Sequence, residues 1–301
     1  MIVVLLGLGA ALVYGASDFF GAFAARRIHL VTATLFNYAV AMIGILLALA
    51  LIGGAWSFGA IEWGVICGVL AVFGLLAFYG VLAIGPMSLL SPLIALIQSV
   101  VPVVAAVITG QALQPLAWVA IGLGIVAMIL LAPRPEPGRQ HITRRGALLA
   151  VASGLLLGVS LVALDFAPKD SGVVPSVLEI AAGLAVLCIV WLIIRLLPSK
   201  PDGVLSVLQP GADAVAGLSA RRAWLAAAGS GVLVAAADAM IVLDLHVGNL
   251  AIVSVLVALY PVLTVILAAT VLKERMTRLQ FVAVGLVIVA SLLFSATNQT
   301  N

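Results

Sequence analysis

Long apolar stretches dominate the chain, and short polar stretches separate them. Ten of the apolar stretches are long enough to cross about 30 Å of hydrocarbon as α-helices. They cover residues 2–24, 31–53, 61–84, 88–109, 115–132, 146–166, 173–197, 223–245, 248–271 and 279–296. No stretch has the alternation of a strand. The pattern therefore predicts an all-α membrane protein with ten transmembrane helices.

Two of the polar connections are longer than the others. Residues 133–145 contain three prolines and four arginines and separate the first five helices from the last five. A second polar loop, at 198–222, interrupts the later half. We therefore expect a first five-helix unit at 1–132, an inter-repeat loop at 133–145 and a second unit at 146–301.

The two halves carry related sequences. Residues 116–130 align with 279–293 at an offset of 163, and nine of these fifteen positions are identical. Upstream, Pro102 aligns with Pro261 at an offset of 159. Because each copy has five helices, an odd number, the second copy must be inserted upside down. The sequence thus predicts two inverted five-helix repeats, an arrangement that secondary transporters use with a binding site between the halves near the bilayer midplane.

Composition excludes several classes of protein. Hydrophobic residues make up 65% and charged residues only 8%, whereas a soluble domain has about 25% charged residues. No basic stripe lies outside the loops, so no nucleic-acid partner is expected. Cys67 and Cys188 lie inside apolar stretches and are predicted to be small buried residues without a disulfide. No metal-ligand spacing and no cofactor motif are present.

The positive charges indicate an orientation. Of the 14 Lys and Arg residues, only Lys169 falls on the side opposite to the others. Positive residues favour the cytoplasmic side. Because the ten-helix arrangement puts both ends of the chain on the side opposite to these residues, the bias predicts that both termini lie outside the cytoplasm. The expected location is the inner or plasma membrane of the cell, as a multi-pass protein.

Several acidic residues lie within the apolar stretches, whereas every Lys and Arg lies in a loop or at a helix end. These acids are Asp18, Asp165, Glu179, Asp238 and Asp244. An acid near the bilayer centre costs about 2.5–3.5 kcal/mol on insertion scales. Each must therefore be protonated, be hydrated in a cavity or meet a cation. This favours proton coupling or a cationic or zwitterionic substrate.

Asp238 and Asp18 are the acids predicted to bind a proton or a substrate amine. Asp238 is the deepest in its stretch and has small neighbours, and Asp18 lies one turn beyond Tyr14. The alternative for Asp238 is a structural, protonated acid bonded to a neighbouring helix. The other acids and one histidine fall toward the outer ends, where we expect a solvated rim: Asp165, Glu179, Asp244 and His246.

Two prolines are hinge candidates. Pro102 removes the helical hydrogen bond to the carbonyl of Gln98, and Pro261 does the same to Val257. A freed carbonyl at membrane depth is tolerated where it is buried in protein or faces a cavity. Pro102 and Pro261 are therefore predicted as hinges; a packing kink is the alternative.

Polar tips inside the stretches give further candidates. Tyr79, Gln98 and Tyr260 are predicted to contact the substrate by polar or stacking contacts, although Tyr79, like Asn37, also suits a bond between helices. The small-residue pairs at 64–68 and 154–158 are expected to pack helices within one chain. The protein is expected to be a monomer or a homodimer.

The end of each repeat resembles the EamA-type branch of the drug/metabolite transporter superfamily. In the second copy the matching residues are Pro261, Leu272, Lys273, Glu274, Arg275, Gln280 and Gly285. In the first copy they are Pro102, Gly110, Gln111 and Gly122, without the glutamate of the family pattern. Residues 15–19 resemble the opening helix motif, with Tyr14 in place of a tryptophan. The resemblance implies transport of small metabolites, amino acids or drugs, and cytoplasmic termini, which conflicts with the charge bias.

The sequence therefore predicts a secondary active transporter, an exporter of small organic molecules, that works by alternating access and could be driven by protons. Two alternatives are a membrane-embedded enzyme acting on lipid and a non-transporting scaffold. An enzyme needs a nucleophile beside a base, and the three histidines, at 29, 141 and 246, lie in or beside loops. We therefore expect no enzymatic activity.

Overall fold

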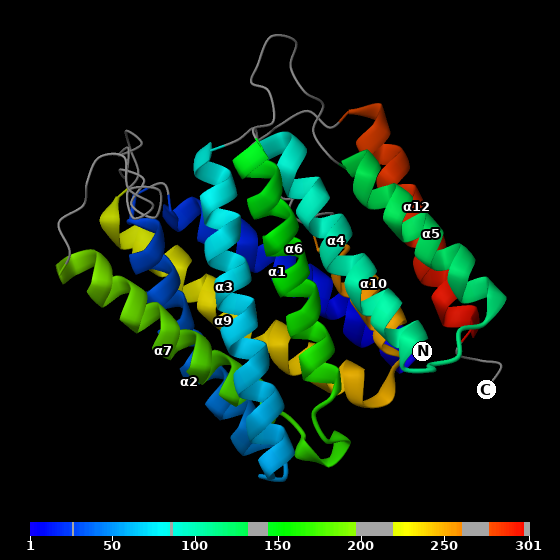
Figure 1. Ribbon diagram of the computed structural model, residues 1–301, viewed down its shortest axis with the longest axis horizontal. Coiled ribbons are helices and arrows are strands. Elements are labelled where there is room, and N and C mark those ends of the chain that lie inside the picture. Colours follow the sequence, from blue (N-terminus) through cyan, green and yellow to red (C-terminus); the bar gives the residue numbers. More distant parts are fainter. Residues whose placement is uncertain (26, 85–86, 132–143, 197–218, 261–276, 298–301) are drawn as a thin grey trace.

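The computed structural model describes residues 1–25, 27–84, 87–131, 144–196, 219–260 and 277–297. These ranges form ten α-helices and one short 3₁₀ helix, and they contain no strand (Figure 1). The elements are α1 (Ile2–Ala25), α2 (Leu30–Ile52), α3 (Phe58–Ile84), α4 (Met87–Ile108), α5 (Pro115–Leu131), α6 (Arg144–Asp165), η1 (Lys169–Ser171), α7 (Val174–Leu196), α9 (Ala220–Val247), α10 (Leu250–Val257) and α12 (Arg278–Thr297). The prediction of an all-α chain with ten helices agrees with these ranges, and most boundaries fall within a few residues of those expected.

Six of the helices are long and apolar enough to cross a membrane. They are α1, α2, α3, α6, α7 and α9, and shorter apolar segments lie in α4, α5 and α12. Large apolar side chains such as Leu51 and Ile108 are 87% and 79% exposed. Exposed apolar side chains on this scale suit contact with lipid better than contact with water. The chain is therefore a multi-pass membrane protein.

The helices of the first half pack mainly on helices of the second half. α1 packs along α9 and α3 along α6, while α2 and α7 contact each other as well as α9 and α3 respectively. α4 packs on α6, and α10 on α1 and α4. α5 and α12 pair at the edge of the bundle (Figure 1). The interior is thus built by both halves together.

Glycines allow some of these helices to approach closely. Gly64 and Gly68 of α3 pack on α7, and Gly154 and Gly158 of α6 pack on α4. A side-chain carbon added at Gly158 would lie 2.7 Å from Cβ of Val101, closer than such atoms approach. The prediction that both small-residue pairs pack helices within one chain is confirmed.

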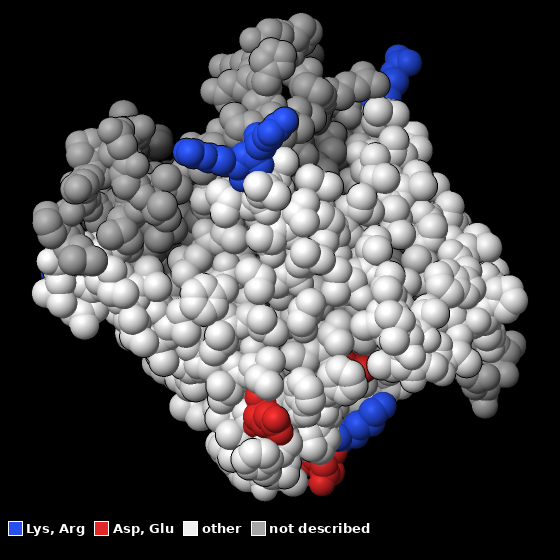
Figure 2. All heavy atoms as spheres, in the orientation of Figure 1, with Lys and Arg blue, Asp and Glu red and all other residues white. Residues whose placement is uncertain are grey.

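The two ends of the bundle differ in charge. Arg144 and Arg278 begin α6 and α12 at one end, where Figure 2 shows basic side chains and no acidic ones among the described residues. Lys169 lies at the other end, and it lines a cavity together with Ile2, the first residue of α1. The start of the chain is therefore on the side of Lys169, opposite the arginines. Which of these ends faces the cytoplasm remains a prediction.

Both cysteines are free thiols. Cys67 on α3 is buried, as predicted. Cys188 on α7 is exposed, so the prediction that it is buried was wrong. An apolar stretch indicates a membrane helix, but it does not tell which side of that helix faces outward.

Candidate functional site

The ring of Tyr14 on α1 meets the ring of Tyr260, which follows α10. Their centroids are 6.0 Å apart and the planes are tilted by 52°. Asp18, one turn further along α1, is exposed, and its carboxyl interacts electrostatically with both phenol groups. The structure therefore brings together two of the predicted site residues, Asp18 and Tyr260, from different halves of the chain.

Asp238 lies in the interior, on the part of α9 that faces α7. It is 6% exposed, and its backbone carbonyl accepts a hydrogen bond of 3.2 Å from Ser176 Oγ. Glu179 follows Ser176 by about one turn of α7, and its carboxyl interacts electrostatically with that of Asp238. We call Glu179 and Asp238 the central acid pair. No Lys or Arg of the described ranges contributes to the electrostatics of either acid.

Side chains from three more helices surround the central acid pair. The thiol of Cys67 on α3 interacts electrostatically with the Glu179 carboxyl. Tyr14 on α1 interacts electrostatically with both acids and with Tyr38 on α2. The atom Oε2 of Glu179 is buried and has no hydrogen-bond partner among the described residues. Five helices, α1, α2, α3, α7 and α9, thus bring titratable groups to one place.

The expectation that Glu179 lies at a solvated rim was wrong. Its position near the start of α7 suggested an outer end. However, Gly68 leaves no side chain between α3 and α7, so a carbon added there would collide with the carbonyl oxygen of Glu179. This close approach places Glu179 against Cys67 in the interior. The position of a residue along a helix does not tell which side of the helix it lies on. The sequence therefore did not indicate that Glu179 faces the interior.

A small polar cluster connects α1, α2 and α9 beside Asp18. Ser17 Oγ and Ser230 Oγ lie 3.0 Å apart, and Ser230 Oγ donates to the carbonyl of Ser17 at 2.9 Å. Asn37 Nδ2 on α2 donates to Ser230 Oγ at 2.6 Å. These bonds fix the position of α1 against α9 and hold Asp18 in place. Asn37 therefore connects helices, as its sequence position suggested.

The remaining predicted residues are not brought to this group by the described contacts. The carbonyl of Gln98 lies 3.2 Å from the place of a side-chain carbon at Gly158, so it faces α6. Pro102 is buried, and α4 runs without interruption around it. Tyr79 lies on α3, but its side chain is outside the described residues, as is all of Pro261. Their roles stay predictions.

The chain leaves α-helical geometry just before Pro261. The amide of Leu259 donates to the carbonyl of Leu256 at 3.2 Å, and that of Tyr260 donates to Val257 at 3.0 Å. Bonds to the third residue back are those of a tighter 3₁₀ turn. Such turns are frequent at the ends of α-helices, and this one follows the end of α10.

Gln111, between α4 and α5, joins three segments at the end that carries Lys169. Its Nε2 donates to Asp165 Oδ2 of α6 at 3.2 Å, and its Oε1 accepts from the amide of Leu250 at 3.0 Å. Leu250 is the first residue of α10, whose next amide, that of Ala251, is capped by Asn249 at 2.9 Å. We call the contacts of Gln111 with Asp165 and Leu250 the Gln111 bridge.

Asp244 is the most buried of the acids in the described ranges. It is 0% exposed, and neither carboxyl oxygen has a hydrogen-bond partner among the described residues. A side-chain carbon added at Gly7 of α1 would lie 2.9 Å from Asp244 Oδ2 and 2.9 Å from Cβ of Leu256 on α10. The expected solvated rim was wrong for Asp244, because α1 and α10 cover this side of α9.

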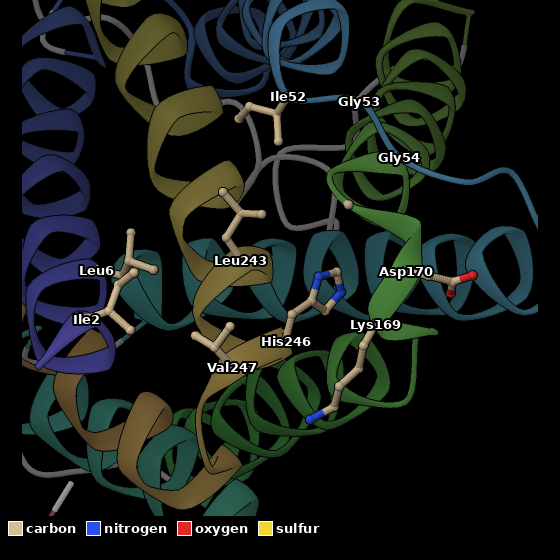
Figure 3. A pocket seen from close by; sticks show the side chains of 11 residues that line it. Ile2, Leu6, Ile52, Gly53, Gly54, Lys169, Asp170, Leu243, His246 and Val247 are labelled. Atoms are coloured by element: carbon tan, nitrogen blue, oxygen red, sulfur yellow. The ribbon is translucent and has the colours of Figure 1, made fainter. Parts of the chain in front are cut away.

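A cavity of about 560 Å³ opens near the same end of the bundle. It lies among the first turns of α1, the end of α9, and the connections at 52–54 and 169–172. Figure 3 shows the ring of His246 extending from α9 toward the Lys169–Ser171 turn, while the side chain of Asp170 points away from it. The Nε2 atom of His246 is buried and without a hydrogen-bond partner in the described part of the chain. This cavity is separate from the central acid pair.

Apolar helices that enclose acids without a basic partner in the described ranges are typical of multi-pass membrane proteins with a functional site in the membrane, such as transporters. The sequence model described as "EamA-like transporter family" matches residues 144–296, half of the chain. The chain belongs to this family, as the motifs at the end of each repeat indicated. The matched half is the one whose motifs follow the family pattern more fully.

A comparison with solved structures supports the fold. One structure, titled "Crystal structure of protein", is similar with a TM-score of 0.68 and 19% sequence identity. The alignment covers 99% of this chain and 98% of that chain. At this identity the likeness concerns the fold alone. No curated protein matches the chain.

Proposed function

We propose that the protein is a secondary active transporter, an exporter of small organic metabolites, amino acids or drugs, that works by alternating access and is driven by protons. The observation that carries this proposal is the central acid pair. Two carboxyls that interact in the interior, with no basic partner among the described residues, suit the binding of a proton or a cationic group. Enzyme and scaffold functions have no comparable support.

The pairing of helices supports an inverted-repeat plan. If α1 corresponds to α6, α2 to α7, α3 to α9, α4 to α10 and α5 to α12, the main described contacts have counterparts. The contact of α1 with α9 then matches that of α6 with α3, and α2 with α9 matches α7 with α3. The contact of α4 with α6 matches that of α10 with α1. Alternation would exchange two similar conformations of the halves.

The site residues have distinct roles in this proposal. Asp18 and Asp238 exchange protons or hold the substrate amine. Tyr260 stacks on the substrate beside Tyr14, and Tyr79 and Gln98 add polar contacts. The hinges would be Pro102 and Pro261. The protein would act in the inner or plasma membrane of the cell, as a monomer or homodimer.

Flux into proteoliposomes tests the proposal. Vesicles with a trapped pH dye would be exposed to radiolabelled amino acids and to a quaternary ammonium compound, with and without a proton gradient. We expect gradient-dependent movement of at least one compound and no such movement after Asp238→Asn. The matched control is Asp170→Asn, an exposed acid outside the central site. Absence of flux across a broad panel, with correctly folded protein, would favour a scaffold.

A further inference from the structure

Asp244 is a fully buried carboxyl with no hydrogen-bond partner for either oxygen in the described part of the chain. Both oxygens lack a hydrogen-bond donor among the described residues, and the residue is 0% exposed. Gly7 on α1 lies against it, and Leu256 on α10 lies against the same glycine. An ionised carboxylate without water, donors or a cation is strongly disfavoured, whereas the neutral acid can be buried at far smaller cost.

The surroundings contain no described group that could neutralise this carboxyl. The facing residues on α1 and α10 are Gly7 and Leu256, and neither titrates. Along α9 the nearest titratable groups are Asp238 and His246, and neither contributes to the electrostatics of Asp244. No Lys or Arg of the described ranges contributes either. In this conformation the carboxyl must therefore carry a proton.

Gly7 shows that the space is fitted closely to the acid. Any larger residue would place its Cβ 2.9 Å from Asp244 Oδ2 and from Cβ of Leu256. The space between Gly7 and Asp244 has no room for water unless α1 moves away from α9 and α10. α1 and α10 belong to different halves of the chain, and α10 leads directly to the tight turn before Pro261. Loss of the proton and separation of these helices are thus linked.

We propose that Asp244 is a second proton-binding site, occupied while α1, α9 and α10 are packed together and emptied when they separate. Its use in transport rests on the function proposed above. The binding of the proton and its link to helix separation do not depend on that function. Both can be measured without substrate.

Thermal unfolding in detergent gives the first test. Raising the pH from mildly acidic to mildly alkaline favours the ionised carboxyl, which the packed helices exclude, so the wild type should lose stability. Asp244→Asn keeps the shape and cannot ionise, so it should lose less, with a difference of about 5 °C in melting temperature at the alkaline end. The other buried acids remain in both proteins, so only the difference is assigned to Asp244. Asp170→Asn should follow the wild type.

A local probe gives the second test and does not depend on global unfolding. Val3 is 5% exposed and would lie 3.0 Å from a side-chain carbon at Gly248, so it reports the packing of α1 on the end of α9. A single cysteine at Val3→Cys, with Cys67 and Cys188 replaced, would be labelled by a maleimide. Labelling should rise with pH at least threefold more in the parent than with Asp244→Asn, because the higher reactivity of the thiolate is common to both.

Parallel pH curves for the parent and the Asp244→Asn variant in both measurements would overturn the proposal. If Asp244→Asn does not fold, Asp244→Leu serves in its place, since it also removes the proton site. A protein that shows the pH-linked opening but no flux would keep the proton site and refute the transport function. A protein with gradient-driven flux but parallel pH curves for the parent and the Asp244→Asn variant would support the transport function and refute the proton site.

Discussion

The Gln111 bridge allows a specific prediction, because the side-chain amide of Gln111 makes two different hydrogen bonds. The nitrogen donates to Asp165, and the oxygen accepts from the amide of Leu250. An amide side chain can do both, whereas a carboxylate can only accept. A glutamate, the residue type of the family pattern at this point, would still accept from the amide of Leu250. Toward Asp165, however, it would place one carboxylate oxygen against another.

The cost of breaking the bridge can be estimated from its two bonds. A hydrogen bond to a charged group contributes about 1.5–3 kcal/mol and one between neutral groups about 0.5–1.5 kcal/mol. Asp165 is only partly buried, so solvent reduces the first value. We expect Gln111→Ala to lower the free energy of unfolding by about 2–3 kcal/mol. Gln111→Glu should cost at least as much at neutral pH and less in acid, where one carboxyl of the pair is protonated.

Thermal unfolding of the purified protein measures these effects. A loss of about 2–3 kcal/mol corresponds to a fall of about 3–5 °C in melting temperature for a chain of this size. Thr109→Val is the control, because the Thr109 hydroxyl bonds only carbonyls of its own helix, those of Ala105 and Ala106. It should change the melting temperature by no more than a degree or two.

Asp165→Asn in the Gln111→Glu background completes the test. The asparagine amide can donate to the new carboxylate, so the double variant should regain most of the stability lost by Gln111→Glu. If Gln111→Glu is as stable as the wild type at every pH, or if Asp165→Asn gives no recovery, the bridge does not hold these segments together.

Three further outcomes follow from the sequence and the fold. With both termini outside the cytoplasm, alkaline phosphatase fused to Asn301 should be active and green fluorescent protein should be dark; the opposite pattern would show cytoplasmic termini. Asp238→Asn should retain binding of transported compounds but lose accumulation driven by a proton gradient, and normal accumulation would make Asp238 a structural acid. Pro102→Ala and Pro261→Ala should slow turnover and shift cysteine accessibility to opposite sides of the membrane, whereas equal shifts would leave both prolines a packing role only.

The sequence predicted the helices well because a membrane helix needs little more than a long apolar run. The same reason explains the close agreement of the boundaries with the polar connections. Glu179 and Asp244 show the limit of this reasoning. Their distance along the helix suggested an outer rim, but burial depends on which neighbour covers that side. For Glu179 this neighbour is α3 at Gly68, and for Asp244 it is α1 at Gly7.

The candidate site was predicted in part. Asp18 and Tyr260 meet around Tyr14, and Asp238 lies in the interior as its depth suggested. The partner of Asp238 could not be foreseen, because residues 179 and 238 are brought together by the packing of α7 on α9 and not by any spacing. The Gln111 bridge likewise depends on a contact between segments far apart in sequence.

The bonds between Ser17 and Ser230 have a consequence for the synthesis of the protein. The two residues are 213 positions apart, yet α1 makes its main contact with α9. A ribosome adds about 5–20 residues per second, so α1 enters the membrane on the order of 10 to 40 s before its partner is made. During that time the hydroxyl and carbonyl of Ser17 must be hydrated or shielded by something other than α9. Nascent chains stopped before residue 220 should therefore be bound by an insertion factor or degraded faster than full-length chains.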